Sequence, residues 1–277
     1  KRLNNKCDSV LLVEWDKLRK LMWSENCMIN PAGWIQCVQK IAKAKENILF
    51  TEFAQNDVPE FLIFLIDGFH NAIKREVEMN ITGNIQNDTD KVAKCCYEMI
   101  KNMYKNEYSE ILTMFYGIHV SKIIDIDSGE NLSLRPESFF TIDLHLKNNL
   151  DEENCNIYDC LDDYYSFERL SGDNMWLNDK TNKKQEVDKC ISVWSFPDIV
   201  IISLKRFINF NKKDSRLVQF PLIDLDLRKY SIGYDKDSYI YDLYAIANHE
   251  GGMNGGHYTA NILNANGNWY NFNDTNI

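Results

Sequence analysis

Apolar residues recur at helical spacing near the start of the chain. Leu11, Trp15, Leu18 and Met22 are spaced three or four residues apart, so they share one face of a helix. Charged residues lie between them, as is typical of a helix with one buried face and one solvated face. The pattern therefore predicts an amphipathic helix over residues 10–23.

Capping signals predict further helices downstream. Asn30-Pro31 can begin a helix, because Asn caps helix N-termini and Pro suits the first turn. Asp57 can cap a third helix, which carries an apolar pattern up to Ile73. Residues 91–104 indicate one more helix after the polar stretch 79–88. The first ~115 residues are thus expected to be helical. The apolar face of the second helix comprises Trp34, Cys37, Val38 and Ile41.

The pattern changes to short alternating runs after Ser109. Strands are predicted within residues 117–126, 139–146, 198–210 and 239–249. The apolar run 199–204 is typical of a strand at the centre of a covered sheet. A helix is expected over residues 156–170, and residues 172–188 are polar enough for an extended hairpin or a loop. Helices followed by strands indicate an α+β fold.

The last strands form a predicted hairpin that carries a histidine. Gly255-Gly256 precede His257, and residues 264–267 are a turn that leads into a returning strand, residues 269–272. This return would bring Asn273 or Asp274 beside His257. A histidine held by a carboxamide or carboxylate is the base of many nucleophilic sites. The alternative is a hairpin with an exposed histidine and a polar turn.

Composition limits the partners and the setting of the protein. The net charge of −10 disfavours nucleic acid and favours a basic partner. No apolar run approaches the ~18–20 residues of a membrane span. Eight cysteines without a secretory signal indicate reduced thiols in the cytoplasm or nucleus. The chain has no C-x-x-C pair, so neither a metal site nor another cofactor is expected.

Several separate stretches resemble one family, the ubiquitin-specific proteases, which are papain-like cysteine deubiquitinases. They follow the order of the family across nearly the whole chain, and this order is more specific than any single match. The stretches are Met22-Trp23-Ser24, Gln55-Asn56-Asp57 with Glu60-Phe61-Leu62, Phe115-Tyr116-Gly117, Tyr158-Asp159-Cys160-Leu161, Leu204-Lys205-Arg206-Phe207, Phe220-Pro221-Leu222, Tyr241 to Ala245, Asn248-His249 and the His257 hairpin.

The resemblance implies a papain-like fold with a helical thumb, a β-sheet palm and fingers. The chain would be one catalytic domain, truncated at both ends, with residues 1–115 as thumb and 116–277 as fingers and palm. His257 would be the base, oriented by Asn273, with Asp274 able to share that role. Ubiquitin and ubiquitinated proteins would be the partners of a monomeric enzyme. The residues implied to bind ubiquitin are Gln55, Asp57, Phe207, Gly256 and Tyr258.

Two departures from the family pattern matter. Residues 123–126 and 174–177 stand where many relatives carry zinc-binding C-x-x-C pairs, so zinc-free fingers are expected. The N-terminal Gly-Asn-x-Cys box is absent, and the nucleophile is expected upstream of residue 1. Cys27 resembles that box faintly, but its spacing to Gln36 is too long. The alternative function is an inactive module that retains the fold and binds ubiquitin.

Other residues have plain structural interpretations. His70, His119 and His145 lie within helix or strand patterns and are expected to be structural. Residues 248–256 contain four glycines and predict a mobile loop beside the site, with His249 either supporting this loop or lining the cleft. Glu60 is expected to serve helix packing.

Overall fold

The computed structural model describes residues 3–4, 6–24, 29–52, 55–146, 154–209, 212–253 and 255–276. Two compact units are present. The first comprises Lys1–Met79 with Met103–Met114, and the second comprises Asn80–Asn102 with Phe115–Ile277. The boundary after residue 114 agrees with the predicted change of pattern. Residues 80–102, however, group with the strands and not with the helical half expected over residues 1–115.

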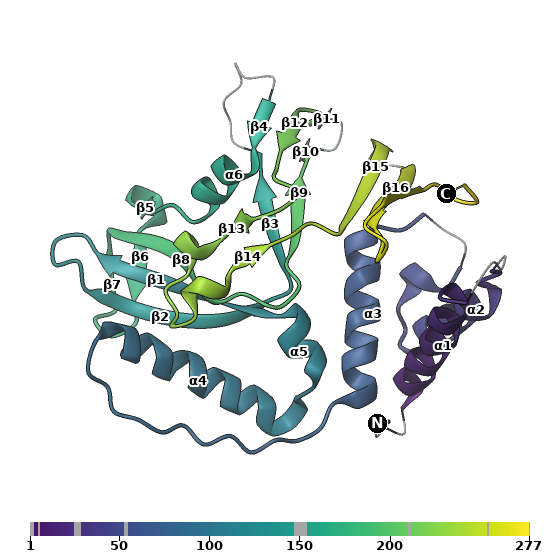
Figure 1. Ribbon diagram of the computed structural model, residues 1–277. Coiled ribbons are helices and arrows are strands. Elements are labelled where there is room, and N and C mark those ends of the chain that lie inside the picture. Colours follow the sequence, from purple (N-terminus) through teal and green to yellow (C-terminus); the bar gives the residue numbers. More distant parts are fainter. Residues whose placement is uncertain are drawn as a thin grey trace. The chain divides into compact units, whose positions relative to one another are not determined.

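The helical unit contains α1 (Cys7–Met22), α2 (Ala32–Ala44), the 3₁₀ turn η1 (Ile48–Phe50) and α3 (Val58–Ile73), followed by α5 (Glu110–Phe115) (Figure 1). The predicted stripe of α1 is buried at Leu11, whereas Met22 is exposed. Gly68 lets α1 and α3 approach, since a Cβ there would lie 2.5 Å from Leu11 Cδ2. The α2 face is buried as predicted at Cys37, Val38 and Ile41.

The sheet-rich unit is built around two groups of strands. β1 (Gly117–Asp125) pairs with β2 (Asn131–Phe139) and β8 (Val187–Ser195), and β5 (Glu168–Leu170) extends this antiparallel sheet. β3 (Thr141–His145) pairs in parallel with β9 (Ile201–Lys205). The remaining short pairs are β4 (Asn154–Asn156) with β12 (Leu217–Gln219), β6 (Trp176–Asn178) with β7 (Lys183–Gln185), β10 (Phe207–Asn209) with β11 (Lys212–Lys213), and β13 (Leu225–Asp226) with β14 (Ile240–Tyr241).

The packing of α4 (Asp88–Glu107) explains why residues 80–102 belong to this unit. Val92, Ala93 and Cys96 of α4 share a buried cluster with Val120 of β1 and Trp194 of β8. Burial of this apolar face against the sheet removes apolar surface from water, and this favourable free energy holds the segment there. The amphipathic period of residues 91–104 predicted the helix but could not tell which partner its face would meet.

A second core lies under α6 (Ile157–Tyr164) and β3. Ile142, Leu144 and Leu161 are fully buried in it. The run expected at the centre of a covered sheet forms β9, whose residues are only half-buried or exposed. Its partner β3 alternates buried Ile142 and Leu144 with half-buried Thr141 and Asp143. In the described residues the two strands pair only with each other, so the expected central position of the run is not observed. The expected helix over residues 156–170 ends at Tyr164, because residues 168–170 pair with β8 as β5.

Candidate active site

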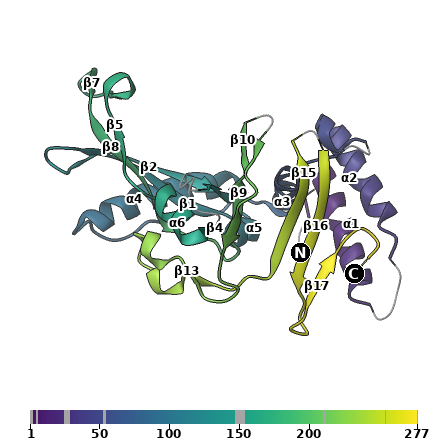
Figure 2. The ribbon, with the colours of Figure 1, turned by 90° about the horizontal axis from the view of Figure 1, so that it is seen from above.

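The closing hairpin forms as predicted. β15 (Ala245–Gly252), β16 (Gly255–Leu263) and β17 (Trp269–Phe272) make an antiparallel sheet in that order (Figure 2). Gly267 adopts φ +81° in the turn between β16 and β17, a conformation that suits glycine. The register places His257 directly across from Glu250 of β15.

His257 and Asn273 are joined by a hydrogen bond. His257 Nε2 lies 2.7 Å from Asn273 Oδ1. Because a carboxamide oxygen only accepts, Nε2 carries the hydrogen and donates it. The neutral ring then keeps its lone pair on Nδ1, which can accept a proton. Asn273 is itself held, since its backbone exchanges two 2.9 Å hydrogen bonds with Asn276. The arrangement is that of an oriented base.

Asp274 lies in the turn closed by Asn273 and Asn276. It is exposed and adopts φ +52°. Within the described ranges no hydrogen bond joins Asp274 to His257, and the orienting bond comes from Asn273 alone. A shared orienting role for Asp274 remains a prediction.

The glycine-rich segment before His257 is strand and not loop. Residues 248–252 continue β15, and Gly251 pairs with Gly256. A Cβ on Gly251 would lie 2.7 Å from the Gly255 oxygen, so glycine is required for this close approach. The prediction of a mobile loop over residues 248–256 was therefore wrong for the described part of the segment. The glycines permit close cross-strand pairing instead of a flexible turn.

His249 is the centre of a cluster that contains three of the predicted substrate residues. Its ring centroid lies 4.7 Å from that of Tyr258 and 6.1 Å from that of Phe207. A Cβ on Gly256 would lie 2.2 Å from His249 Nε2, so only glycine fits there. Lys213 Nζ donates to His249 Nδ1 at 3.1 Å. We call Phe207, Lys213, His249, Gly256 and Tyr258 the His249 cluster.

No motif or spacing in the sequence pointed to Lys213. It lies in the run Asn211-Lys212-Lys213-Asp214, which looks like a solvated turn. Only the pairing of β10 with β11 brings its ammonium group to β15. His249 was expected to support a loop or to line the cleft, and in the structure it contacts Lys213 and the rings of Phe207 and Tyr258.

The other two predicted substrate residues, Gln55 and Asp57, lie before α3 in the helical unit. Asp57 occupies the N-cap position, but its side chain makes no capping hydrogen bond. Both residues are exposed. Asp57 therefore stands at the expected N-cap position, but its carboxylate does not cap the helix by a hydrogen bond.

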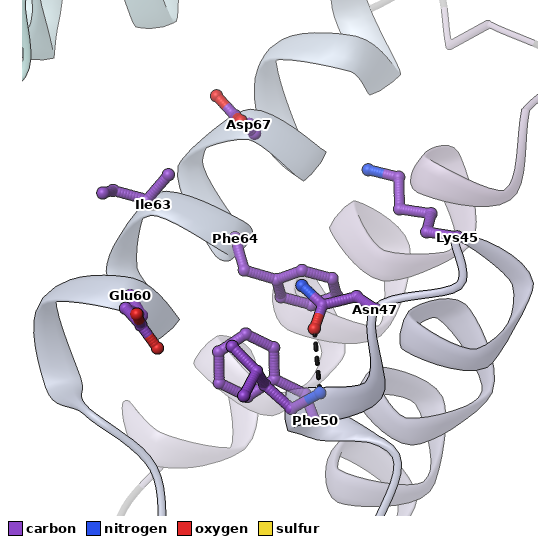
Figure 3. Close-up of a pocket in the computed structure, with 8 residues that line it drawn as sticks. Lys45, Asn47, Phe50, Glu60, Ile63, Phe64 and Asp67 are labelled. Atoms are coloured by element: carbon purple, nitrogen blue, oxygen red, sulfur yellow. Dashed lines mark hydrogen bonds between the residues drawn. The ribbon is translucent and has the colours of Figure 1, made fainter.

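The helical unit also contains a pocket of about 320 Å³ (Figure 3). Its walls come from α3 and from the segment that includes η1. Asn47 shapes that segment, because its side chain accepts a 3.0 Å hydrogen bond from the Leu49 amide. Glu60, expected to serve helix packing, is exposed and faces this pocket. None of the predicted site residues lines it.

Most of the described cysteines are buried, whereas Cys7 is exposed and Cys95 is half-buried. Cys37, Cys96, Cys155, Cys160 and Cys190 are buried. Burial raises the pKa of Cys96 to about 12 and also raises the pKa of Cys37 and of Cys190. A raised pKa leaves little thiolate, which is the reactive form. Cys27, the rejected candidate nucleophile, lies outside the described residues.

Two of the other histidines are internal groups. His119 is buried in β1, and His70 Nδ1 lies 2.7 Å from Ser109 Oγ, with its pKa lowered mainly by burial. His145 is exposed at the end of β3. Across the described ranges, no cluster of His, Cys, Asp and Glu side chains could hold a metal ion. No helix in those ranges is long and apolar enough to cross a membrane.

Comparison with known proteins gives one consistent family. The profile of the family described as ubiquitin carboxyl-terminal hydrolase matches residues 1–277. The chain is 30% identical over 280 residues to human ubiquitin carboxyl-terminal hydrolase 2, covering 97% of the chain and 44% of that protein. It is 26% identical to the probable ubiquitin carboxyl-terminal hydrolase R319 of Acanthamoeba polyphaga mimivirus, covering 94% of the chain and 64% of that protein.

A solved structure shares the fold. The SAGA Ubp8/Sgf11/Sus1/Sgf73 DUB module bound to ubiquitin aldehyde contains a chain that matches with a TM-score of 0.68 at 22% identity. The match covers 98% of this chain and 55% of that one. The predicted α+β fold of the papain-like type is thereby confirmed. The chain spans less than half of human hydrolase 2.

Proposed function

The chain belongs to the ubiquitin carboxyl-terminal hydrolase family, of the ubiquitin-specific protease type, and we propose that it acts as a cysteine-dependent deubiquitinase. The bond cleaved is the isopeptide or peptide bond after the C-terminal Gly of ubiquitin. The observation that carries this proposal is the 2.7 Å hydrogen bond between His257 and Asn273.

His257 is the proposed base. With Nε2–H held by Asn273, Nδ1 is free to take the proton of a cysteine thiol. The thiolate then attacks the carbonyl carbon of the C-terminal Gly of ubiquitin. The protonated imidazole returns the proton to the departing amine, which leaves a thioester. A water molecule, deprotonated by the same imidazole, hydrolyses this thioester and releases ubiquitin.

The nucleophile is expected upstream of residue 1. The raised pKa values of Cys37, Cys96 and Cys190 make these three thiols poor nucleophiles. Catalysis by residues 1–277 alone would require a thiol that lies beside His257, and we do not assign one.

The substrate is proposed to bind through its extended C-terminal tail. An extended peptide presents backbone N–H groups, and the exposed carboxylate of Asp57 can accept from them. Gln55 can supply further hydrogen bonds. The ring of Phe207 is partly exposed and can make apolar contact with the tail. His249 contacts both the Phe207 ring and the Tyr258 ring. The absence of a side chain at Gly256 leaves room for close approach of a peptide.

The test uses the full-length protein with a ubiquitin–fluorophore amide. Turnover that depends on a cysteine upstream of residue 1 is the expected result. Residues 1–277 alone should bind ubiquitin and give no turnover. A full-length protein that binds ubiquitin without turning over the amide would establish the inactive ubiquitin-binding module instead. Failure of the full-length protein to bind or cleave would refute both functions.

A further inference from the structure

We propose that Lys213 is a positioning residue for this reaction, because it fixes the strand segment that lies directly across from His257. This inference rests on the proposed function and extends it to a residue that touches neither the substrate bond nor the imidazole of His257.

The ammonium group of Lys213 contacts the two residues of β15 that flank Glu250 in sequence. Its Nζ donates to the backbone oxygen of His249 at 2.7 Å and to that of Gly251 at 3.3 Å. Glu250 lies between these two acceptors and pairs with His257. The third contact is the one to His249 Nδ1, at 3.1 Å. An ammonium group has three hydrogens, and here three acceptors are available to it.

This part of β15 lies at the edge of its sheet. In the sheet order β15-β16-β17, β15 is an edge strand, so one row of its backbone groups receives no ladder partner from that sheet. The pairs at its end, Gly251 with Gly256 and Gly252 with Gly255, have no side chains to pack. Glycine pairs are conformationally permissive, and a segment with few contacts opens locally at low cost. Lys213 supplies the anchor that side chains at these positions do not.

The anchor also joins β15 to the strand pair that carries Phe207. Lys213 pairs with Phe207 across β10 and β11, and its Nζ lies 5.6 Å from the centroid of the Phe207 ring. Phe207 is a proposed contact for the ubiquitin tail, whereas β16 carries the base. One ammonium group therefore fixes the distance between a tail-binding strand pair and the catalytic hairpin. A shift of about 1 Å in such a distance can cost 10²-fold in rate.

The test compares Lys213→Met with Lys212→Met in the full-length protein. Lys212 is the matched control, because it is adjacent, exposed and of the same charge, and none of the hydrogen bonds to β15 involves it. Lys213→Met should lower kcat for the ubiquitin–fluorophore amide by roughly ten- to hundredfold while KM changes less than about threefold. Lys212→Met should leave both unchanged. Lys213→Arg, which keeps the charge and several donors, should restore part of the loss.

A second readout does not depend on activity. Amide hydrogen exchange at residues 249–257 should be faster in Lys213→Met than in Lys212→Met, with melting temperatures that agree. If the two variants show the same exchange and the same kcat, Lys213 is not a positioning residue, even when the wild type is active. If the wild type shows no turnover, the proposed function fails, and the exchange comparison still decides whether Lys213 anchors β15. A large drop in melting temperature with no change in kcat would assign Lys213 a purely structural role.

Discussion

Two histidines on β-strands differ in nearly every physical respect. His119 of β1 is 9% exposed, and its ring stacks on Phe139 with centroids 3.8 Å apart. Its Nε2 lies 3.1 Å from the hydroxyl of Tyr165, and burial lowers its pKa to about 4. His257 of β16 is exposed and is held by the Asn273 amide. The first is an internal packing group, and the second is an accessible, oriented ring.

The difference shows that a histidine on a β-strand cannot be identified as a catalytic base from its residue type and strand position alone. His119 is flanked by Ile118 and Val120, which are buried against α4. His257 follows two glycines that admit close cross-strand pairing but add no bulk. Access to a substrate and a fixed orientation are both needed for a base, and only His257 has both.

The largest expected effect follows from replacing each ring. His257→Ala in the full-length protein should lower turnover by roughly 10²- to 10⁴-fold, which is the contribution of a positioned base. Ubiquitin affinity and melting temperature should stay close to wild type, because the ring is exposed. His119→Ala should lower the melting temperature and change turnover by the folded protein little, because this ring is buried in β1 away from the hairpin. Steady-state kinetics and thermal melts of both variants check the contrast, and a fully active His257→Ala protein would remove it.

The second effect is on stability as a function of pH. The unfolded chain protonates His119 near pH 6.5 and the folded chain only near pH 4, so the stabilising contribution is complete above about pH 6.5. It is lost as the pH falls to about 4. The difference between these two pKa values corresponds to about 3 kcal/mol of unfolding free energy.

Urea unfolding at several pH values, in wild type and in His119→Gln, measures the contribution of His119 to the pH dependence of the unfolding free energy. The wild type should lose more stability between pH 7 and 4 than the variant, by about 3 kcal/mol at most. Equal pH slopes in the two proteins would show that His119 does not titrate as a buried group.

A similar contrast holds between two carboxylates of the helical unit. Asp8 is buried, with an oxygen 2.6 Å from Lys45 Nζ, whereas Asp57 is exposed and makes no capping bond. A hydrogen bond to a charged group is worth roughly 1.5–3 kcal/mol, so Asp57→Ala should weaken ubiquitin binding about tenfold to a hundredfold. Stability should change by less than the ~1 kcal/mol of a lost cap.

Calorimetric titration with ubiquitin and a thermal melt separate these two roles of Asp57. Unchanged affinity in the folded variant would exclude Asp57 from the substrate site. A lower melting temperature with unchanged affinity would make it a helix cap after all.

The smallest expected effect concerns the orientation of His257 within the hairpin. Asn273→Ala leaves the base in place but removes its orienting bond, and should lower kcat by roughly tenfold. Asn273→Asp keeps an oxygen that can accept from Nε2 and should retain most activity. If Asn273→Ala is fully active while Asp274→Ala is not, the orienting role belongs to Asp274.

Local periodicity was enough to predict much of this fold. The helices at α1, α2 and α3 and the β16–β17 hairpin follow from spacing, caps and turn residues within a few positions of one another. The pairing of His257 with Asn273 was predictable for the same reason, since a short hairpin joins them.

Interactions between distant segments set the rest. The helix at residues 156–170 is cut short because residues 168–170 pair with β8. Ile202 and Leu204 of the run 199–204 are only partly buried where they pack against the core that contains β3. Lys213 reaches β15 from a segment 36 residues away in sequence. A lysine in a polar run gives no sequence signal for such a contact, so this part of the site became visible only in the fold.

The role of His257 as the base is tested most directly by capture of the full-length protein with ubiquitin that carries a C-terminal electrophile. Intact mass gives the rate of adduct formation for wild type, His257→Ala and His119→Gln. We expect a one-to-one adduct with wild type, a rate within about threefold of it for His119→Gln, and a rate at least ~100-fold lower for His257→Ala. A His257→Ala protein that is captured as fast as wild type would contradict the assignment of His257 as the base.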